Sequence, residues 1–180
     1  PVGGGSHRPI GPVRSLLRNP SFSRDGRFLF FEGSSTDLRE VFRLQLDTQK
    51  LVALTKNREG NFQPSLSPTG DKIVFVSSRD QVAELYLTST TGGPAKRLTQ
   101  TERDEWQPQW SPDGNWLMFG SDREGADRIY LQSLDGRKAK RLSPEGLDPF
   151  VVEENASFSP DGKAVVYVHR QREHKDKLCL

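Results

Sequence analysis

The stretch Pro108-Gln109-Trp110-Ser111-Pro112-Asp113-Gly114 recurs at three other places in the chain and decides the fold. The other copies are Pro20–Gly26, Pro64–Gly70 and Ala156–Gly162, each ending in the same glycine. These four glycines lie 44, 44 and 48 residues apart along the chain. A period of about 40–45 residues is typical of repeats that each form one small sheet.

Within each repeat the sequence has the pattern of short strands joined by tight turns. After the glycine, apolar residues alternate and form two columns of equivalent positions: Leu29, Ile73, Leu117 and Val165, then Phe31, Phe75, Phe119 and Tyr167. A polar turn precedes a further apolar pair in each repeat: Val41-Phe42, Leu85-Tyr86, Ile129-Tyr130 and Leu178-Cys179. Period-2 alternation between turn residues predicts β-strands, and no segment has helical periodicity. We therefore predict an all-β protein, a β-propeller of four-stranded antiparallel blades.

The repeat boundaries divide the chain into a short leader and one propeller domain. We expect residues 1–6 to be a flexible linker and residues 7–180 to form the propeller. The repeats span about residues 12–55, 56–99 and 100–143, and a fourth comprises residues 144–180 together with 7–11.

The fourth repeat ends after its third predicted strand, whereas an extra segment around Ile10 precedes the first repeat. Because Ile10 lies 44 residues before Leu54, which ends a fourth strand, we expect the N-terminal strand to complete the last blade. Three arrangements are open: a closed four-bladed ring, a half-ring that dimerises into eight blades, or a fragment of a longer propeller. The complementary ends favour self-completion or assembly over a fragment.

Composition and motifs set limits on the function. With 26 Lys+Arg and 24 Asp+Glu, the net charge of +2 gives no field that indicates a nucleic-acid partner. The longest apolar runs are far shorter than the ~20 residues needed to cross a bilayer, so membrane insertion is not expected. We find no nucleophile elbow, phosphate-binding loop or zinc-binding helix motif, and the single cysteine is Cys179. We therefore expect no cofactor and no metal, and favour a non-enzymatic role.

One polar column is the strongest candidate for a binding site. Asn19, Gln63, Gln107 and Asn155 occupy equivalent positions, one residue before each predicted inner strand. In a propeller the inner strands surround the central channel, so four side-chain amides there would form a ring of hydrogen-bond donors and acceptors. The alternative is that each amide only forms hydrogen bonds with the backbone of the loop that connects successive blades.

Aromatic and acidic residues flank this amide column in the segments that lead to the inner strands. These residues are Phe62, Trp106, Glu105 and the pair Glu153-Glu154. Such residues could bind a partner peptide at the channel mouth. We therefore include Phe62, Glu105, Trp106 and Glu154 in the candidate site. Alternatively, Trp106 packs between neighbouring blades while the carboxylates are solvated.

The repeat is similar to that of TolB-like β-propellers. The resemblance rests on Gln107-Pro108-Gln109-Trp110-Ser111-Pro112-Asp113-Gly114, on Asn115–Asp122 after it and on Arg128-Ile129-Tyr130-Leu131 beyond, and it covers about residues 12–180. It implies a periplasmic or other extracytoplasmic location in a bacterium. Propellers of this type also occur in serine peptidases and lyases, so the resemblance is specific for the blade and not for the chemistry.

These observations predict a binding or scaffolding module that recognises a protein or peptide at the channel mouth and top loops. Two other functions remain open: the propeller portion of a TolB-like hydrolase or lyase, and a repeat unit that assembles into a larger ring as a homo-oligomer.

Overall fold

The computed structural model describes residues 10, 15–34, 38–57, 59–135, 137–144, 151–171 and 176–180. Their regular secondary structure is entirely β and forms four antiparallel sheets. Blades 1 to 4 contain, in order, β1 (Ser15–Phe22), β2 (Phe28–Ser34), β3 (Arg39–Gln45) and β4 (Leu51–Ala53); β5 (Asn61–Leu66), β6 (Lys72–Ser77), β7 (Glu84–Ser89) and β8 (Lys96–Arg97); β9 (Glu105–Trp110), β10 (Trp116–Ser121), β11 (Arg128–Ser133) and β12 (Lys140–Arg141); β13 (Val152–Phe158), β14 (Val165–Arg170) and β15 (Lys177–Cys179). The prediction of an all-β propeller fold built of four repeats is confirmed.

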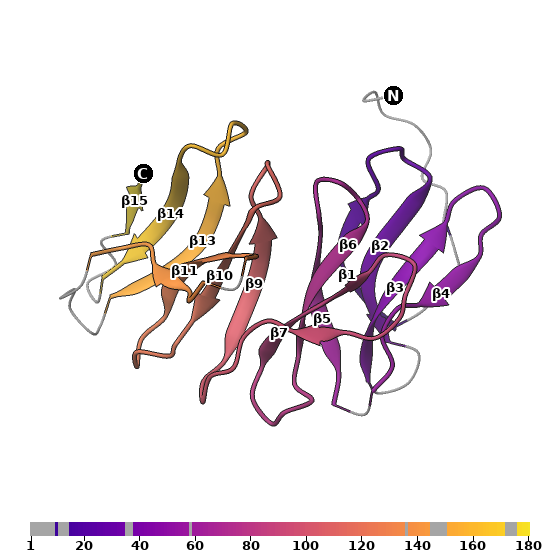
Figure 1. Ribbon diagram of the computed structural model, residues 1–180, viewed down its shortest axis with the longest axis horizontal. Helices are drawn as coiled ribbons and strands as arrows, with labels where there is room; N and C mark the ends of the chain where they lie inside the picture. The colour runs from indigo at the N-terminus through magenta and orange to yellow at the C-terminus, as the bar shows by residue number, and fades with distance from the viewer. Residues whose placement is uncertain are drawn as a thin grey trace.

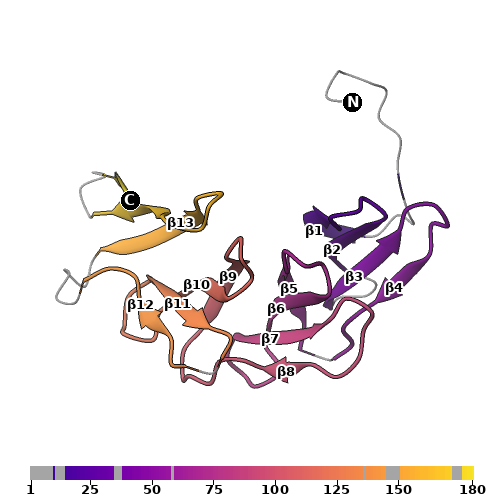
Figure 2. The same ribbon diagram turned by 45° about the horizontal axis from the view of Figure 1, so that its top comes forward.

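The blades follow one another along an open arc, with blades 1 and 4 at its two ends (Figures 1 and 2). The first strand of each blade packs on the blade before it: β5 contacts β1, β2 and β3, β9 contacts β5, β6 and β7, and β13 contacts β10 and β11. In the described residues, blade 4 has three strands. The segment 7–11, expected to complete it, lies outside the described residues except for Ile10, so closure by this segment stays a prediction.

The apolar columns become the cores of the junctions between blades. Phe75 stacks on Tyr86 with ring centroids 6.0 Å apart, and Phe119 stacks on Tyr130 at 6.1 Å. Residues Ile73 to Val76 of β6 are completely buried, because this strand lies between blades 1 and 3 and both of its faces are covered. The corresponding strand β14 of blade 4 is only half-buried.

The turn after the first strand of each blade is held by its own side chains, and its sequence is Ser-Pro-Asp-Gly in blades 3 and 4. In blade 3, Asp113 Oδ1 accepts hydrogen bonds from Ser111 Oγ at 2.5 Å and from the N–H of Asn115 at 3.0 Å. Gly114 takes the left-handed conformation (φ +74°) that completes the turn. The Ser111 hydroxyl, followed by the Asn115 N–H, holds the pKa of Asp113 below its ordinary value of 3.8.

We expect Asp113→Ala to lower the thermal unfolding midpoint at neutral pH, because the turn then loses both hydrogen bonds. Since the pKa of Asp113 is lower in the folded protein than in the unfolded chain, its contribution is present above pH 3.8 and is lost as the pH falls further. The difference in midpoint between the variant and the wild type should therefore shrink below that pH. Glu102→Ala, at an exposed position, is the control. An equal effect of the two substitutions would contradict this role of Asp113.

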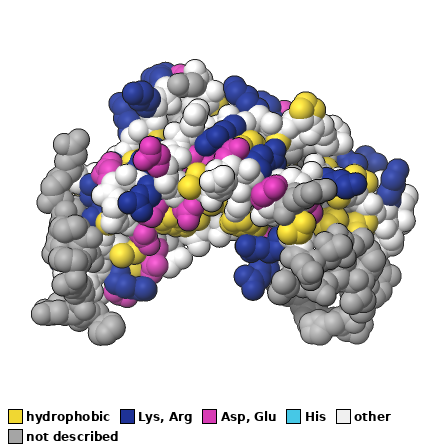
Figure 3. All heavy atoms as spheres, turned by 90° about the horizontal axis from the view of Figure 1, so that it is seen from below, with side chains coloured by type: hydrophobic (Ala, Val, Ile, Leu, Met, Phe, Trp, Pro, Cys, Tyr) yellow, Lys and Arg dark blue, Asp and Glu magenta, His cyan; other side chains and the backbone are white. Residues whose placement is uncertain are grey.

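The face of the molecule seen from below carries both signs of charge. On the face seen from below, Lys and Arg side chains are interspersed with Asp and Glu (Figure 3). Within the described part of the chain, no helix has the length and apolar character needed to cross a membrane.

Candidate functional site at the channel mouth

The four amide residues lie within the inner strands, not one position before them as predicted. Asn19, Gln63 and Gln107 have φ of +50°, and Asn155 has φ of +54°, all in the left-handed region. Each sits where the pairing between the first and second strands of its blade shifts register. The prediction of the strand start was wrong because pairing begins earlier, for example at Asn61, and continues past a bulge. Bulges of this kind redirect a side chain out of the regular alternation.

The bulges direct these residues of all four blades to one cavity of about 430 Å³. Its wall consists of the amide residues and the backbone that follows them: Asn19, Gln63, Pro64, Gln107, Pro108, Gln109, Asn155 and Ala156. The spacing of the repeat thus brings side chains separated by more than a hundred residues to a common mouth. Amides that both donate and accept hydrogen bonds alternate there with apolar proline rings.

A buried carboxylate that sequence reasoning missed anchors the half of the mouth made by blades 1 and 2. Glu32 is 1% exposed and accepts hydrogen bonds from Asn19 Nδ2 at 3.2 Å and from the N–H of Gln63 at 3.0 Å. It also forms an ion pair with Arg39 at 3.0 Å. The sequence did contain one indication of this role. Glu32 is charged, whereas the equivalent positions in blades 2 and 3 are the uncharged Val76 and Gly120.

Two hydrogen bonds between a side chain and the backbone link blade 3 to blades 2 and 4 at the mouth. The N–H of Gln107 donates to Gln63 Oε1 at 2.8 Å across the junction of blades 2 and 3. Gln109 Nε2 donates to the carbonyl oxygen of Ala156 at 2.8 Å across the next junction. The side chains of Gln107 and Asn155 are exposed, and neither has a hydrogen-bond partner among the described residues. These two amides are therefore open to a ligand.

The two aromatic candidates lie within the strands and are not among the residues that line the cavity. Phe62 is half-buried against the core between blades 2 and 3, and the guanidinium of Arg39 lies 4.4 Å from its ring centroid. Trp106 pairs with Gly120 of the adjacent strand, and its indole covers the space that a side chain at that glycine would occupy. Phe62 therefore packs between blades, and Trp106 packs against Gly120 within blade 3.

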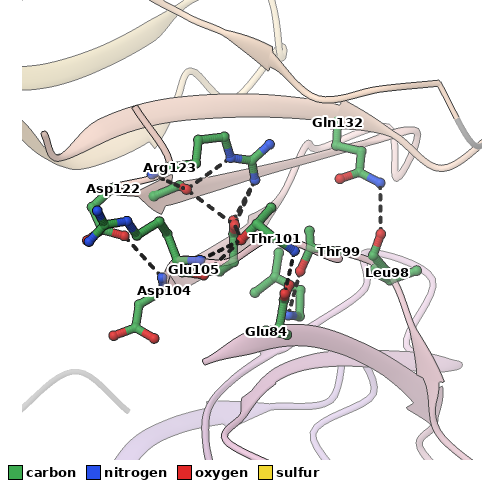
Figure 4. Close-up of polar contacts among 12 residues, drawn as sticks. Glu84, Leu98, Thr99, Thr101, Asp104, Glu105, Asp122, Arg123 and Gln132 are labelled. Atoms are coloured by element: carbon green, nitrogen blue, oxygen red, sulfur yellow. Dashed lines mark hydrogen bonds and ion pairs between the residues drawn. The ribbon is translucent and has the colours of Figure 1, made fainter. Parts of the chain in front are cut away.

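The acidic candidates also lie within strands rather than in the preceding loops. Glu105 is fully buried, and both of its carboxylate oxygens accept from Arg123 Nη2 at 2.8 Å (Figure 4). Burial raises the pKa of Glu105 to about 7, against the opposing effect of Arg123. Glu153, its equivalent in blade 4, is also buried, whereas Glu154 is half-buried and pairs with Arg170 at 2.6 Å. The alternative of solvated carboxylates is therefore wrong for Glu105 and Glu153.

In the part of the chain that the structure describes, no three His, Cys, Asp or Glu side chains gather in an arrangement suited to a metal ion. The residues that line the cavity at the mouth carry uncharged amide and apolar side chains.

Comparisons with known proteins agree with this architecture. A family model described as the TolB beta propeller domain matches residues 3–178. TolB from Acinetobacter baumannii superposes with a TM-score of 0.77 at 26% identity, over 91% of this chain and 40% of that protein. A protein from Agrobacterium tumefaciens, identified provisionally as TolB, superposes with a TM-score of 0.79 at 23% identity, over 94% of this chain and 62% of that one. The search of curated proteins found no match.

The fold is shared with propellers of different function. A puromycin-hydrolyzing peptidase from Mycobacterium tuberculosis superposes with a TM-score of 0.70 at 16% identity, over 89% of this chain and 30% of that protein. At this identity the likeness concerns the fold alone. The chain spans 40% and 62% of the lengths of the two TolB structures.

Proposed function

Because the chain belongs to the TolB beta propeller domain family, we propose that it is a non-catalytic binding module that holds an extended segment or an end of a protein partner at its channel mouth. The observation that carries this proposal is the pair of unpartnered amides, Gln107 and Asn155, which face one cavity together with Gln63 and Asn19. Their left-handed backbone fixes these side chains on rigid strands.

The chemistry of the mouth suits a polypeptide main chain. A peptide bond offers one donor and one acceptor, and a side-chain amide can meet both. The rings of Pro64 and Pro108 supply apolar contact beside these groups. Since the lining residues carry no charge and the face in Figure 3 has no large area of one sign, recognition would rest on hydrogen bonds and shape. Gln63, Gln107 and Asn155 are the residues to which we assign most of the contact.

The proposal also concerns where in the cell the protein acts and whether the chain is part of a larger enzyme. The family supports an extracytoplasmic location, and the partner there would be a protein or peptide. The likeness to the peptidase supports a second role, as the propeller portion of a hydrolase or lyase. A catalytic domain encoded in the same protein would favour that role.

The open arc in Figure 2 supports a further possibility, the assembly of two copies into one larger ring. Light scattering distinguishes this arrangement from a monomer. A mass near 20.3 kDa indicates the monomer, and twice that mass indicates the dimer.

The binding proposal predicts that Gln107→Gly combined with Asn155→Gly weakens capture of a linear peptide selected on the wild-type chain from a random display library. Loss of two amides, each worth about 0.5–1.5 kcal/mol per hydrogen bond, should weaken binding by about 5- to 150-fold. Glycine is chosen because it accepts the positive φ of both positions, so the variant should remain as stable as the wild type. Fluorescence anisotropy with labelled peptide measures the affinity.

Gln81→Gly is the matched control for this experiment. Gln81 is also an exposed amide at positive φ (+74°), but it lies outside the channel mouth. The control should bind as the wild type does. If the double variant bound the peptide with unchanged affinity, the channel mouth would not be the binding site.

A further inference from the structure

Two buried carboxyl groups meet at the junction between blades 2 and 3. Glu84 on β7 and Glu105 on β9 are both 0% exposed. Thr101 joins them, since its N–H donates to Glu84 Oε1 at 2.6 Å and its hydroxyl donates to Glu105 Oε1 at 3.0 Å. Figure 4 shows these two acids on different blades with Thr101 between them. Two ionised carboxylates in one buried site repel each other, which favours the protonated form of one of them.

The equivalent positions in the neighbouring junctions carry different pairs. Between blades 1 and 2 the pair is Glu40 and Asn61, and the Asn61 amide donates to Glu40 Oε2 at 2.7 Å. Between blades 3 and 4 the pair is Arg128 and Glu153, a cation and an anion. Of the three junctions in the described residues, the one between blades 2 and 3 therefore has two acids at these positions.

The charged groups around Glu84 and Glu105 come from both blades. Arg123 contacts Glu105 from blade 3, and Arg97 Nη2 donates to Glu84 Oε1 at 2.8 Å from blade 2. Arg97 also pairs with Asp80 at 3.0 Å, so its charge is shared. The second oxygen of Glu84, Oε2, is buried and has no donor among the described residues. The two guanidinium groups thus leave one oxygen of the acidic pair without a hydrogen bond.

Two further acids lie in the segments that flank the pair. Asp104 Oδ1 accepts from the N–H of Ala83 at 2.8 Å, and Asp122 Oδ1 accepts from the N–H of Asp104 at 3.0 Å. Neither contacts a cation in the described residues. Burial is the main cause that raises the pKa of Glu105 to about 7, and the charge of Glu84 adds to it, while Arg123 and Thr101 lower it. The surroundings of Glu105 therefore favour its protonated form more than water does.

The same junction holds the channel mouth together. Glu105 lies two residues before Gln107 on β9, and its N–H donates to the carbonyl oxygen of Ala83 on blade 2 at 2.7 Å. The N–H of Gln107 then donates to Gln63 Oε1, also on blade 2. Two contacts that join β9 to blade 2 therefore lie two residues apart, one at Glu105 and one at the cavity.

We propose that Glu105 is a proton-controlled lock on this junction, which is closed when its carboxyl group is protonated and loosened when the proton is released to solvent. The ionised carboxylate then adds a negative charge beside Glu84, whose partner Arg97 is shared with Asp80 and whose Oε2 has no hydrogen bond, and the Gln107–Gln63 contact opens. The lock itself can be measured without a ligand, and only its consequence for partner binding rests on the proposed function.

The sign of the effect follows from proton linkage. Because the pKa of Glu105 is about 7 in the folded protein and 4.5 in the unfolded chain, the closed junction binds the extra proton between these two values. The junction should be most stable below pH 4.5, weaken as the pH rises, and reach a constant level above about pH 7. If the open junction gives Glu105 its ordinary pKa, the opening equilibrium rises about tenfold from pH 6 to pH 8.

NMR on the full chain tests the lock by two readouts. Carbon-13 labelling of glutamate carboxyls gives the titration midpoint of Glu105, and hydrogen exchange of the Gln107 N–H gives the opening equilibrium after correction for the intrinsic pH dependence. We expect a midpoint near 7 and about tenfold more opening at pH 8 than at pH 6. The N–H of Gln63, bound to Glu32 in the preceding junction, is the internal control and should show no such change.

Glu84→Gln should lower the Glu105 midpoint and reduce the pH dependence of Gln107 exchange, because the repelling charge is gone. Glu102→Gln, an exposed acid, should leave both unchanged. If Glu84→Gln does not fold, Glu105→Gln gives the same test, because it should make exchange at Gln107 independent of this titration. A wild-type midpoint near 4.5, or Gln107 protection that is equal at pH 6 and pH 8, would overturn the proposal.

A failure of the lock can be told apart from a failure of the binding proposal. The Gln107→Gly, Asn155→Gly variant affects peptide capture at every pH and should leave the Glu105 midpoint in place. Loss of the lock would leave peptide capture intact and remove only its pH dependence.

Discussion

Replacement of Glu32 by alanine is expected to lower the free energy of unfolding by about 3 kcal/mol, since a buried acceptor for three donors disappears. The N–H of Gln63, the amide of Asn19 and the guanidinium of Arg39 all depend on this carboxylate. Arg39 is partly exposed and can regain water, which places the expected loss at the lower end of the range for a broken buried ion pair. Urea denaturation followed by tryptophan fluorescence measures the change.

Two further variants test whether the loss of stability is specific to the Glu32 carboxylate. Glu32→Gln keeps an acceptor oxygen and nearly the same shape, so it should cost less than the alanine substitution. Glu102→Ala removes an exposed acid and should change stability by less than about 0.5 kcal/mol. If Glu32→Ala cost as little as Glu102→Ala, Glu32 would not anchor the junction of blades 1 and 2.

Gly120→Val is expected to destabilise blade 3 by about 3 kcal/mol, because a side chain at this position would overlap the indole of Trp106. The backbone at Gly120 is not in the left-handed region, so the cost comes from lack of space rather than from conformation. Thermal unfolding and urea denaturation of the single variant measure it.

Blade 2 indicates how this overlap can be relieved. Its equivalent cross-strand pair is Phe62 and Val76, a smaller aromatic ring opposite a larger aliphatic side chain. Adding Trp106→Phe to Gly120→Val reproduces that pair in blade 3 and should restore most of the lost stability. A double variant no more stable than Gly120→Val would contradict the assignment of Trp106 to packing.

Much of the architecture could be predicted from the sequence because the repeat aligns equivalent positions without a structure. The alternation at Ile73 and Phe75, and at Leu117 and Phe119, required buried strands, and the structure places them in β6 and β10. The alignment also selected the amides that line the cavity, because a spacing of 44 residues repeats the same location in each blade.

The buried charges could not be predicted in the same way. A glutamate is usually solvated, and nothing in the residues beside Glu84 or Glu105 shows that the packing of one blade on the next buries them. The bulge at Gln107 was missed because a glutamine at positive φ has no local signal, unlike the glycine at position 114. Glu32 was detectable only as a charged residue in an otherwise uncharged column.

Whether amides of different blades act as one site is measured most directly by following their side-chain resonances in a ¹⁵N-labelled chain while the selected peptide is added. The structure predicts that Gln63, Gln107 and Asn155 shift together, with a single dissociation constant equal to that from anisotropy. Shifts confined to one blade, or to residues outside the channel mouth while these amides stay unchanged, would contradict it.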